Sequence, residues 1–428
     1  MAERAARSAS ALQKTAITLS AVLLVTLLAN TLRLAKLPLR VLLKDELSFT
    51  PERMAGFLAL IGLAWYLKPL AGLLSDHVPL YGTRRRHYLL LSGGAGALAW
   101  LVATAYPHAT TTLLIALIAV NLFAVLGNTV GGGLLVDAGR AQSATGLLSA
   151  VRLAAMNLAA VVAGPIGGWL AGRAFVWTCL AGALLMSTMF VAVASLPAQE
   201  APQTPAPLAT TLRDIAVHLK DRRVWSVAVL TLAFYIAPGY QTLWFYHQQD
   251  FLRLSVQEIG LLEALQALGG IAGAACYAGW SSRVGLRTTL PAGIVLNGAC
   301  VGLYAFYDSF AAALVIEPLL GFCVCIGVLP LCELTARASP PRHEAFVFAA
   351  IFGLGNMAMA MADVLGTRMA SALGLELPAL FSLYAACTAA SAVLVLAVPP
   401  ALLDGLAVAT RRESSSGSAD DGATNGAS

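Results

Sequence analysis

Charged residues are scarce in this chain. Asp, Glu, Lys and Arg make up 11% of the 428 residues, whereas 58% are hydrophobic and the mean hydropathy is +0.77. Because a soluble domain carries about 25% charged residues, a water-soluble fold would expose too much apolar surface. The net charge of +5 is small and spread over many loops, which excludes the concentrated basic face of a nucleic-acid-binding protein. We therefore expect lipid to be the main solvent of this protein.

Motifs of catalysis and of covalent cross-linking are also missing. The chain contains no nucleotide cradle, metal-ligand cluster or nucleophile–base motif, so we expect no enzyme activity, cofactor or metal. The seven cysteines lie in apolar stretches, where free cysteine usually packs as a small hydrophobic residue, and they indicate no disulfide framework. The basic first residues are not followed by a short apolar core with a cleavage site, so we expect the N-terminus to be retained.

Long apolar stretches dominate what is present. A membrane-spanning helix needs about 20 mainly apolar residues, and twelve stretches qualify: 15–43, 52–74, 87–106, 111–136, 142–171, 174–196, 224–247, 256–280, 288–307, 310–335, 343–371 and 374–399. These predict an all-α integral membrane fold with two six-helix bundles, 15–196 and 224–399. A linker at 197–223, with an amphipathic helix carrying Leu212, Ile215 and Leu219, joins them. Residues 1–14 are predicted as a tail and 400–428 as a disordered tail.

Basic residues predict the orientation. With the N-terminus inside, the outer loops contain Lys44, Arg53, Arg173 and Arg253, while the inner loops and tails collect a larger set that includes residues 84–86 and 222–223. This distribution agrees with the positive-inside rule. We therefore expect a multi-pass protein of the cell (inner) membrane, monomeric, with both termini in the cytoplasm.

The two halves repeat one short pattern. Residues 45–52 align with residues 250–257, and each segment joins the first helix of a half to its second helix. Thr50 is a predicted helix N-cap followed by Pro51, and Ser255 with Glu258 forms a predicted capping box. Parallel six-helix repeats are the plan of major facilitator transporters, although cap chemistry also recurs by chance.

Several ionisable residues fall inside predicted spans or at their ends. A charge at a helix centre costs about 2.5–3.5 kcal/mol on insertion scales, so such residues usually face a polar interior. Their signs are mixed, which permits pairing, for example of Asp137 with Arg152, and those near helix ends can extend to the interface instead. The set comprises Lys68, Asp137, Arg152, Glu263, Glu317, Glu333, Asp363 and Arg368.

We predict transport roles for part of this set and for Arg40 of the first span, with structural roles as the alternative. Lys68, Arg152 and Arg40 are candidates to attract an anion. Candidates for proton coupling, or for structural ion pairs, are Asp137, Glu263, Glu317 and Asp363. Glu317 precedes Pro318, which breaks a helix and leaves backbone groups in need of partners. The aromatic residues of the seventh span could stack on a flat heterocycle or simply pack; they are Phe234, Tyr235, Trp244 and Tyr246.

The first and fourth spans have unusual compositions. In the first span Asn30, Arg33, Leu37, Arg40 and Lys44 recur at helical spacing and predict one basic face, with Lys36 off that face. Such a face could serve an anionic substrate; alternatively, the helix ends near Leu32 and these side chains are solvated. The fourth span carries a run of glycines that includes Gly131, Gly132 and Gly133, which lets neighbouring helices approach closely.

The connection between the second and third spans combines glycine with opposite charges. Asp76 lies near the end of the second span and arginines open the third. We predict a charge lock here, meaning an ion pair that breaks when the two halves move. The residues of this predicted gating loop are Gly72, Asp76, Gly82, Arg84, Arg85 and Arg86.

Motifs in both halves resemble the folate-biopterin transporter family of the major facilitator superfamily. They are Lys44-Asp45-Glu46-Leu47, Trp65…Lys68-Pro69…Gly72…Ser75-Asp76…Pro79…Gly82…Arg84-Arg85-Arg86, Val136-Asp137-Ala138, Phe245-Tyr246, Gly269-Gly270 and Ala336-Arg337-Ala338-Ser339-Pro340…Glu344-Ala345…Asn356. The resemblance implies proton-coupled, alternating-access transport of a folate, a pterin or a related small organic anion. We place substrate binding or translocation at Lys68, Asp137, Arg152, Tyr246, Glu317 and Asn356. The chain departs from the family pattern at Gly133 and Gln142, where acids are usual.

Two other functions remain compatible with these motifs. One is a non-transporting membrane protein of the same fold that serves in assembly or pigment handling, which would tolerate a sealed cavity. The acids inside its helices argue against this alternative. The other is a major facilitator transporter of an unrelated small molecule.

Overall fold

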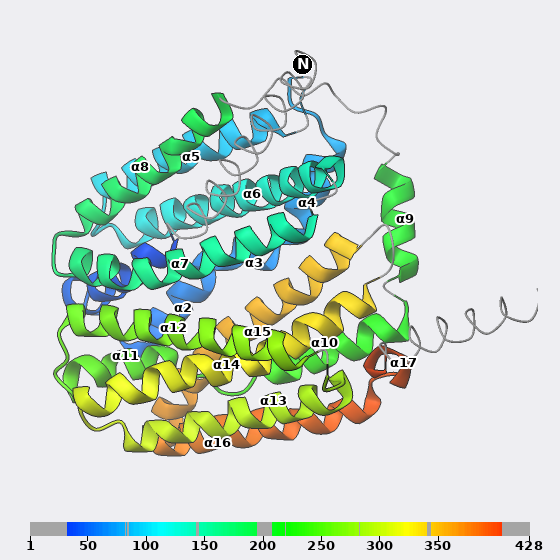
Figure 1. Ribbon diagram of the computed structural model, residues 1–428. Helices are drawn as coiled ribbons and strands as arrows, with labels where there is room; N and C mark the ends of the chain where they lie inside the picture. The colour runs from blue at the N-terminus through cyan, green and yellow to red at the C-terminus, as the bar shows by residue number, and fades with distance from the viewer. Residues whose placement is uncertain are drawn as a thin grey trace, which may run out of the picture.

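The computed structural model describes residues 32–404, apart from positions 82, 84, 143–144, 195–207, 219, 282 and 340–343. Within these residues the regular structure is helical, and the only extended pairing is an isolated bridge between Leu80 and Thr83. Figure 1 shows the helices of the two halves of the chain as two groups that lie one against the other. The predicted all-α fold is confirmed.

The N-terminal half begins, in the described part, with helical residues 32–41 and a π-helical turn at Leu42–Glu46. Its remaining helices are α2 (Pro51–Ile61), α3 (Leu63–Tyr66), α4 (Lys68–His77), α5 (Arg86–Ala105), α6 (Thr110–Gln142), α7 (Thr145–Ala171) and α8 (Phe175–Ala194).

The C-terminal half follows the short helix α9 (Leu208–His218). Its helices are α10 (Arg222–Tyr235), α11 (Gln241–Asp250), α12 (Val256–Trp280), α13 (Leu286–Val301), α14 (Phe310–Ala338), α15 (Glu344–Leu373), α16 (Leu377–Ser391) and α17 (Pro400–Leu403). Short 3₁₀ turns extend α13 at Gly302–Phe306 and α16 at Ala392–Ala397. In α9, Ile215 is buried while Leu212 is exposed, and Leu219 lies outside the described residues.

Eight helices of the described residues are long and apolar enough to cross a membrane. Where its residues are described, each predicted span coincides with helical structure; for the first span this is from residue 32 onward. Two spans expected to be continuous are interrupted, 52–74 at Gly62 and Leu67 and 224–247 between α10 and α11. Pro69 accounts for the interruption at Leu67, and Pro238 for the one between α10 and α11, because proline cannot donate the helical hydrogen bond and clashes with the preceding turn.

The two ends of the molecule can be told apart by their connections. One end, which we call the linker end, carries α9 and α17 (Figure 1). The opposite end, which we call the far end, carries the loops at 47–50 and 251–255. These two loops are held together across the halves, because the Tyr246 hydroxyl donates a hydrogen bond to the carbonyl of Phe49, and Lys44 binds Asp250.

The repeat at the far end is a property of the backbone as well as of the sequence. Ser48 and Arg253, which occupy equivalent positions, both have left-handed backbones with φ of 51° and 56°. The amide of Leu47 donates to the Leu42 carbonyl at 3.0 Å, and the equivalent amide of Leu252 donates to His247 at 3.0 Å. The Thr50 cap and the Ser255–Glu258 capping box are both formed. A chance match of cap residues does not account for this agreement.

Glycines allow the closest helix contacts, but at other positions than the glycine run of α6 suggested. A Cβ on Gly269 of α12 would overlap the backbone carbonyl of Pro318 on α14, and one on Gly164 of α7 would overlap that of Gly260. These are backbone-to-backbone approaches of the kind small residues permit in membranes. In α6, by contrast, Gly132 and Gly133 make room for the guanidinium groups of Arg152 and Arg85.

One pair of cysteines was not anticipated. Cys300 on α13 and Cys323 on α14 are joined as a disulfide, with their Cα atoms 6.5 Å apart. The cysteine positions in the sequence could not reveal this, because the pairing depends on how α13 packs against α14. The other described cysteines are free.

Candidate functional site

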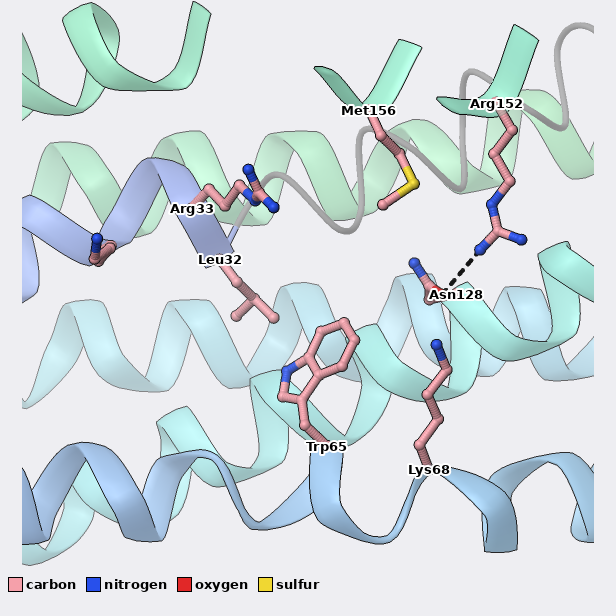
Figure 2. Close-up of a pocket in the computed structure, with 8 residues that line it drawn as sticks. Leu32, Arg33, Trp65, Lys68, Asn128, Arg152 and Met156 are labelled. Atoms are coloured by element: carbon pink, nitrogen blue, oxygen red, sulfur yellow. Dashed lines mark hydrogen bonds between the residues drawn. The ribbon is translucent and has the colours of Figure 1, made fainter. Parts of the chain in front are cut away.

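A cavity of about 360 Å³ lies among helices of the N-terminal half. Four of its eight lining residues are cationic, and the lining includes no Asp or Glu of the described residues. Figure 2 shows side chains reaching toward Asn128 from opposite sides. The lining residues are Leu32, Arg33, Lys36, Trp65, Lys68, Asn128, Arg152 and Met156. Such a lining is suited to a flat or elongated organic anion.

The interruption of the second span places Trp65 and Lys68 in the cavity. Leu67 separates α3 from α4, and Pro69 occupies the second position of α4. The Trp65 indole is held in place because its Nε1–H donates to Asn121 Oδ1 at 2.9 Å. The Lys68 ammonium lies 5.6 Å from the centre of that indole. A fixed aromatic face next to a cation is therefore available to a ligand.

Arg152 of α7 forms the opposite wall. Its guanidinium reaches Asn128 of α6, with 3.4 Å between Nη2 and Oδ1, and lies against Gly132. The Nε atom of Arg152 is buried and has no hydrogen-bond partner among the described residues. Lys68 and Arg152 both approach Asn128 (Figure 2). Because the positive charges of Lys68 and Arg152 lie near the same Asn128 amide, an anion bound between them would be favoured. The predicted pairing of Arg152 with Asp137 stays a prediction, because the Asp137 side chain is not described.

The first helix contributes Arg33 and Lys36, which corrects two expectations. Residues 32–41 are helical and continue into the turn Leu42–Glu46, so the helix does not end near Leu32. Lys36, which the periodicity placed off the basic face, lines the cavity and its Nζ lies 2.9 Å from Glu263 Oε1 of α12. Arg40 is buried at 9% exposure, with its guanidinium 5.6 Å from the Phe245 ring centre. Lys36 therefore links the cavity to the C-terminal half.

Glu317 is the most enclosed of the candidate acids that the structure describes. It is 5% exposed on α14 and accepts two hydrogen bonds, from the Tyr307 hydroxyl at 3.2 Å and from Gln266 Nε2 at 3.1 Å. No cation among the described residues lies within ion-pair distance of its carboxylate. A buried carboxylate held by neutral donors alone is suited to gaining and losing a proton.

Asp363 of α15 caps the broken helix of the C-terminal half. Its Oδ1 accepts from the backbone N–H of Thr242 at 3.0 Å and its Oδ2 accepts from the Thr242 hydroxyl at 2.5 Å. The amide of Gly239 in the break also donates to Ala362 at 2.7 Å. Because the first N–H groups of a helix lack partners in the helix itself, Asp363 satisfies a need that the break creates.

Replacing Asp363 with alanine is expected to lower stability by about 2 kcal/mol, because the N-terminus of α11 loses its acceptor. Asp363→Asn retains an acceptor oxygen and should lose much less. Thermal melting of the purified variants in nanodiscs measures this difference. If Asp363→Asn folded but its uptake no longer responded to a pH gradient, that result would instead support a role of Asp363 in proton coupling.

The aromatic residues predicted to stack on a ligand lie elsewhere. Phe234 is buried in the core at 1% exposure, and Tyr235 packs against Gly355. Trp244 is 7% exposed and packs against Tyr304, with ring centres 4.4 Å apart, and against other aromatic rings. None of these, nor Tyr246 at the far end, lines the cavity. The indole that does line it is Trp65.

The gating-loop residues are described only in part. Gly82 and Arg84 lie outside the described residues, and so does the Asp76 side chain, so the charge lock stays a prediction. The Arg85 guanidinium is directed toward α6, where its Nη1 lies 3.4 Å from the Val130 carbonyl. Gly72 accepts from the Ser75 hydroxyl, and Arg86 begins α5.

Two other predicted residues lie outside the cavity lining. Asn356 is half-buried on α15, three residues beyond Gly353, which contacts the backbone of Tyr66. Glu333 is paired with Arg337 within α14 and accepts from the Tyr277 hydroxyl. Asn128 lines the cavity but was not among the residues predicted for the site. Its spacing of seven from Asn121 places both amides on one face of an otherwise apolar helix, and this signal could have found it.

Comparison with known proteins identifies the family and the fold of this chain. A family model described as the BT1 family matches residues 30–404. The chain is 24% identical over 377 residues to a folate-biopterin transporter of Synechocystis, covering 83% of this chain and 75% of that one. It is 22% identical over 426 residues to a probable folate-biopterin transporter 4 of Arabidopsis thaliana, covering 78% and 84% of the two chains.

Solved structures with the same fold include transporters of other substrates. A D-xylose–proton symporter aligns with a TM-score of 0.69 at 11% identity, over 90% of this chain and 97% of that one. A proton-dependent oligopeptide transporter aligns with a TM-score of 0.67 at 13% identity, over 92% and 100% of the two chains. These identities are too low to carry more than the fold, which is that of the major facilitator transporters.

Proposed function

Because the chain belongs to the BT1 family of membrane transporters, we propose that it carries a folate- or pterin-like organic anion across a membrane by alternating access. The observation that supports this most is the cationic cavity, in which Trp65 offers an aromatic face beside Lys68 and Arg152. A pterin ring would stack on the indole, and carboxylates or an electron-rich ring edge would bind the cations. We propose transport rather than catalysis as the activity.

Alternating access requires contacts between the halves that can open. Among the described residues, the inter-half ion pairs join the first helix and its π-helical turn to α11 and α12. The backbone approach of Gly164 to Gly260 joins α7 to α12 without any side chain that must be moved. We propose that the halves rock about this glycine contact while the two ion pairs break and reform.

The linker end is proposed to be cytoplasmic. Arg222, Arg223, Arg287 and Arg337 belong to the connections and helix ends on that side, and the positive-inside rule assigns such residues to the cytoplasm. Both termini and the gating loop would then be cytoplasmic. The proposal also includes that the protein lies in the cell (inner) membrane and is a monomer.

Uptake into proteoliposomes tests the proposed function. Protein reconstituted with an imposed inward proton gradient is expected to accumulate labelled folic acid or biopterin above empty vesicles. Labelled small aromatic acids serve as the comparison for an unrelated substrate. An absence of flux for all of these compounds would reject the transport proposal.

Glu317 is the acid that we propose for proton coupling. Replacing it with glutamine keeps the side-chain shape and one acceptor oxygen but removes the titrating group. We expect Glu317→Gln to lose the stimulation of uptake by a pH gradient while substrate exchange across the membrane continues. The measurement is folic acid uptake with and without the gradient, beside counterflow in preloaded vesicles. Gradient-driven uptake at the wild-type level would assign Glu317 to structure.

A further inference from the structure

Lys36 takes part in two sites at once. It lines the cavity together with Arg33, Lys68 and Arg152, and its ammonium also lies 2.9 Å from Glu263 on the other half of the molecule. The Lys36 side chain is 47% exposed while it makes this contact. A solute anion in the cavity can therefore reach Lys36 without any rearrangement of the helices.

Glu263 occupies an anion-binding position built by the first helix. The Glu263 carboxylate binds Lys36 and is also attracted by Arg33 and Arg40. These two arginines lie on the first helix, one turn before and one turn after Lys36. Among the cationic residues of the cavity lining, only Lys36 has a carboxylate partner within ion-pair distance in the described part of the chain. In the described part of the chain, the carboxylate that pairs with a cavity cation thus comes from the opposite half.

A second ion pair joins the same two halves without touching the cavity. Lys44 lies 2.5 Å from Asp250 and also donates to Gln249 Oε1 at 2.9 Å. Neither Lys44 nor Asp250 is among the lining residues. This pair provides a matched control, because it shares the inter-half geometry and the charges but not the access to a ligand.

We propose that Glu263 occupies the place of a substrate carboxylate on Lys36, so that cargo and Glu263 exchange on this lysine during each cycle. A carboxylate of the arriving cargo binds Lys36 and thereby weakens the Lys36–Glu263 ion pair between the halves. When the cargo leaves, Glu263 returns and the contact is restored. This inference rests on the proposed transport of an organic anion, and it adds that Lys36 is the residue that binds a carboxylate of the cargo.

The exchange leaves no bare charge in a low-dielectric region. An uncompensated buried charge is strongly destabilising, so a displaced Glu263 needs another cation. Arg40 provides one, because it already attracts the Glu263 carboxylate and its buried Nε has no hydrogen-bond partner among the described residues. Differential binding of this kind is what allows a ligand to shift a conformational equilibrium.

The first test compares two ligands on Glu263→Gln in nanodiscs. Removing the competing carboxylate is expected to lower the Kd of folic acid, which has two carboxylates, by about tenfold, the effect of a close charge pair. The Kd of biopterin, which has none, should stay unchanged. An unchanged or higher Kd for folic acid would overturn the proposal, and so would an equal decrease for both ligands.

The second test exchanges the charges. Lys36→Glu with Glu263→Lys, and Lys44→Asp with Asp250→Lys, should each restore the melting temperature that the single changes lower. Only the first exchange is expected to weaken folic acid binding, by about tenfold or more, because it removes the cation from the cavity lining. Equal, wild-type affinity in both exchanged proteins would overturn the proposal. A wild-type protein that binds neither folic acid nor biopterin would reject the proposed function, and this inference with it.

Discussion

Arg152→Ala is expected to raise the Kd of folic acid about 100-fold, a loss of about 3 kcal/mol. Among the described residues, the Arg152 guanidinium has few hydrogen-bond partners: its buried Nε has none, and its Nη2 makes one long hydrogen bond of 3.4 Å to Asn128 Oδ1. A carboxylate in the cavity would accept hydrogen bonds from both the Nε and the Nη2 groups of Arg152. Isothermal titration of the purified protein in nanodiscs measures the change.

The control for this prediction is another arginine on the same stretch of chain. Arg173 follows α7 and lies over the Trp169 ring at 3.8 Å, away from the cavity. We expect Arg173→Ala to bind folic acid as the wild type does. Arg152→Lys should recover only part of the affinity, because an ammonium cannot reproduce the two-pronged geometry of a guanidinium. Wild-type affinity of a folded Arg152→Ala protein would remove Arg152 from the site.

The largest effect on folding is expected from Gly269→Ala. A single methyl group at this position would overlap the backbone carbonyl of Pro318, and a backbone cannot yield as the end of a flexible side chain can. Overpacking of a close helix contact costs about 3 kcal/mol or more when no relaxation is available. We expect little folded protein, measured as the monodisperse fraction on size-exclusion chromatography and by thermal melting.

Gly270 supplies the matched control because it is the next residue of the same helix. A Cβ there would lie 3.7 Å from the Gly321 carbonyl oxygen, which is an ordinary contact. Gly270→Ala should therefore melt near the wild-type temperature. If the two alanine variants behaved alike, the close approach of α12 to α14 would not be a determinant of the fold.

The positions of the helices could be predicted because membrane insertion is a local property. A stretch of about 20 apolar residues is a candidate span wherever it occurs, and the helix caps at Thr50 and Ser255 involve residues only three apart. The breaks near Pro69 and Pro238 were not predicted, because the residues on both sides of each proline are apolar enough to read as one continuous span. The interruption at Leu67 is what brings Trp65 and Lys68 into the cavity together.

The candidate site was predictable only where a single residue gave the signal. Lys68 and Arg152 stood out because a charge in an apolar helix needs a polar environment. The same argument selected Glu263, Glu317 and Asp363, yet the structure gives them three different surroundings: an ammonium across the halves, two neutral donors, and the N-terminus of a broken helix. Sequence spacing could not separate these surroundings, because each partner lies at least ten residues away.

Three properties of this chain could be inferred from the order of its residues alone: that it is a membrane protein of paired helical bundles, that cations and acids lie inside its spans, and to which family it belongs. These follow from composition, from local periodicity and from short motifs, all of which act over a few helical turns. That Lys36 lines the cavity and binds Glu263, and that Asp363 caps α11, became evident only from the packing of the helices. Charge pairing depends on distances of a few ångströms between helices far apart in the chain, and helix packing alone sets those distances.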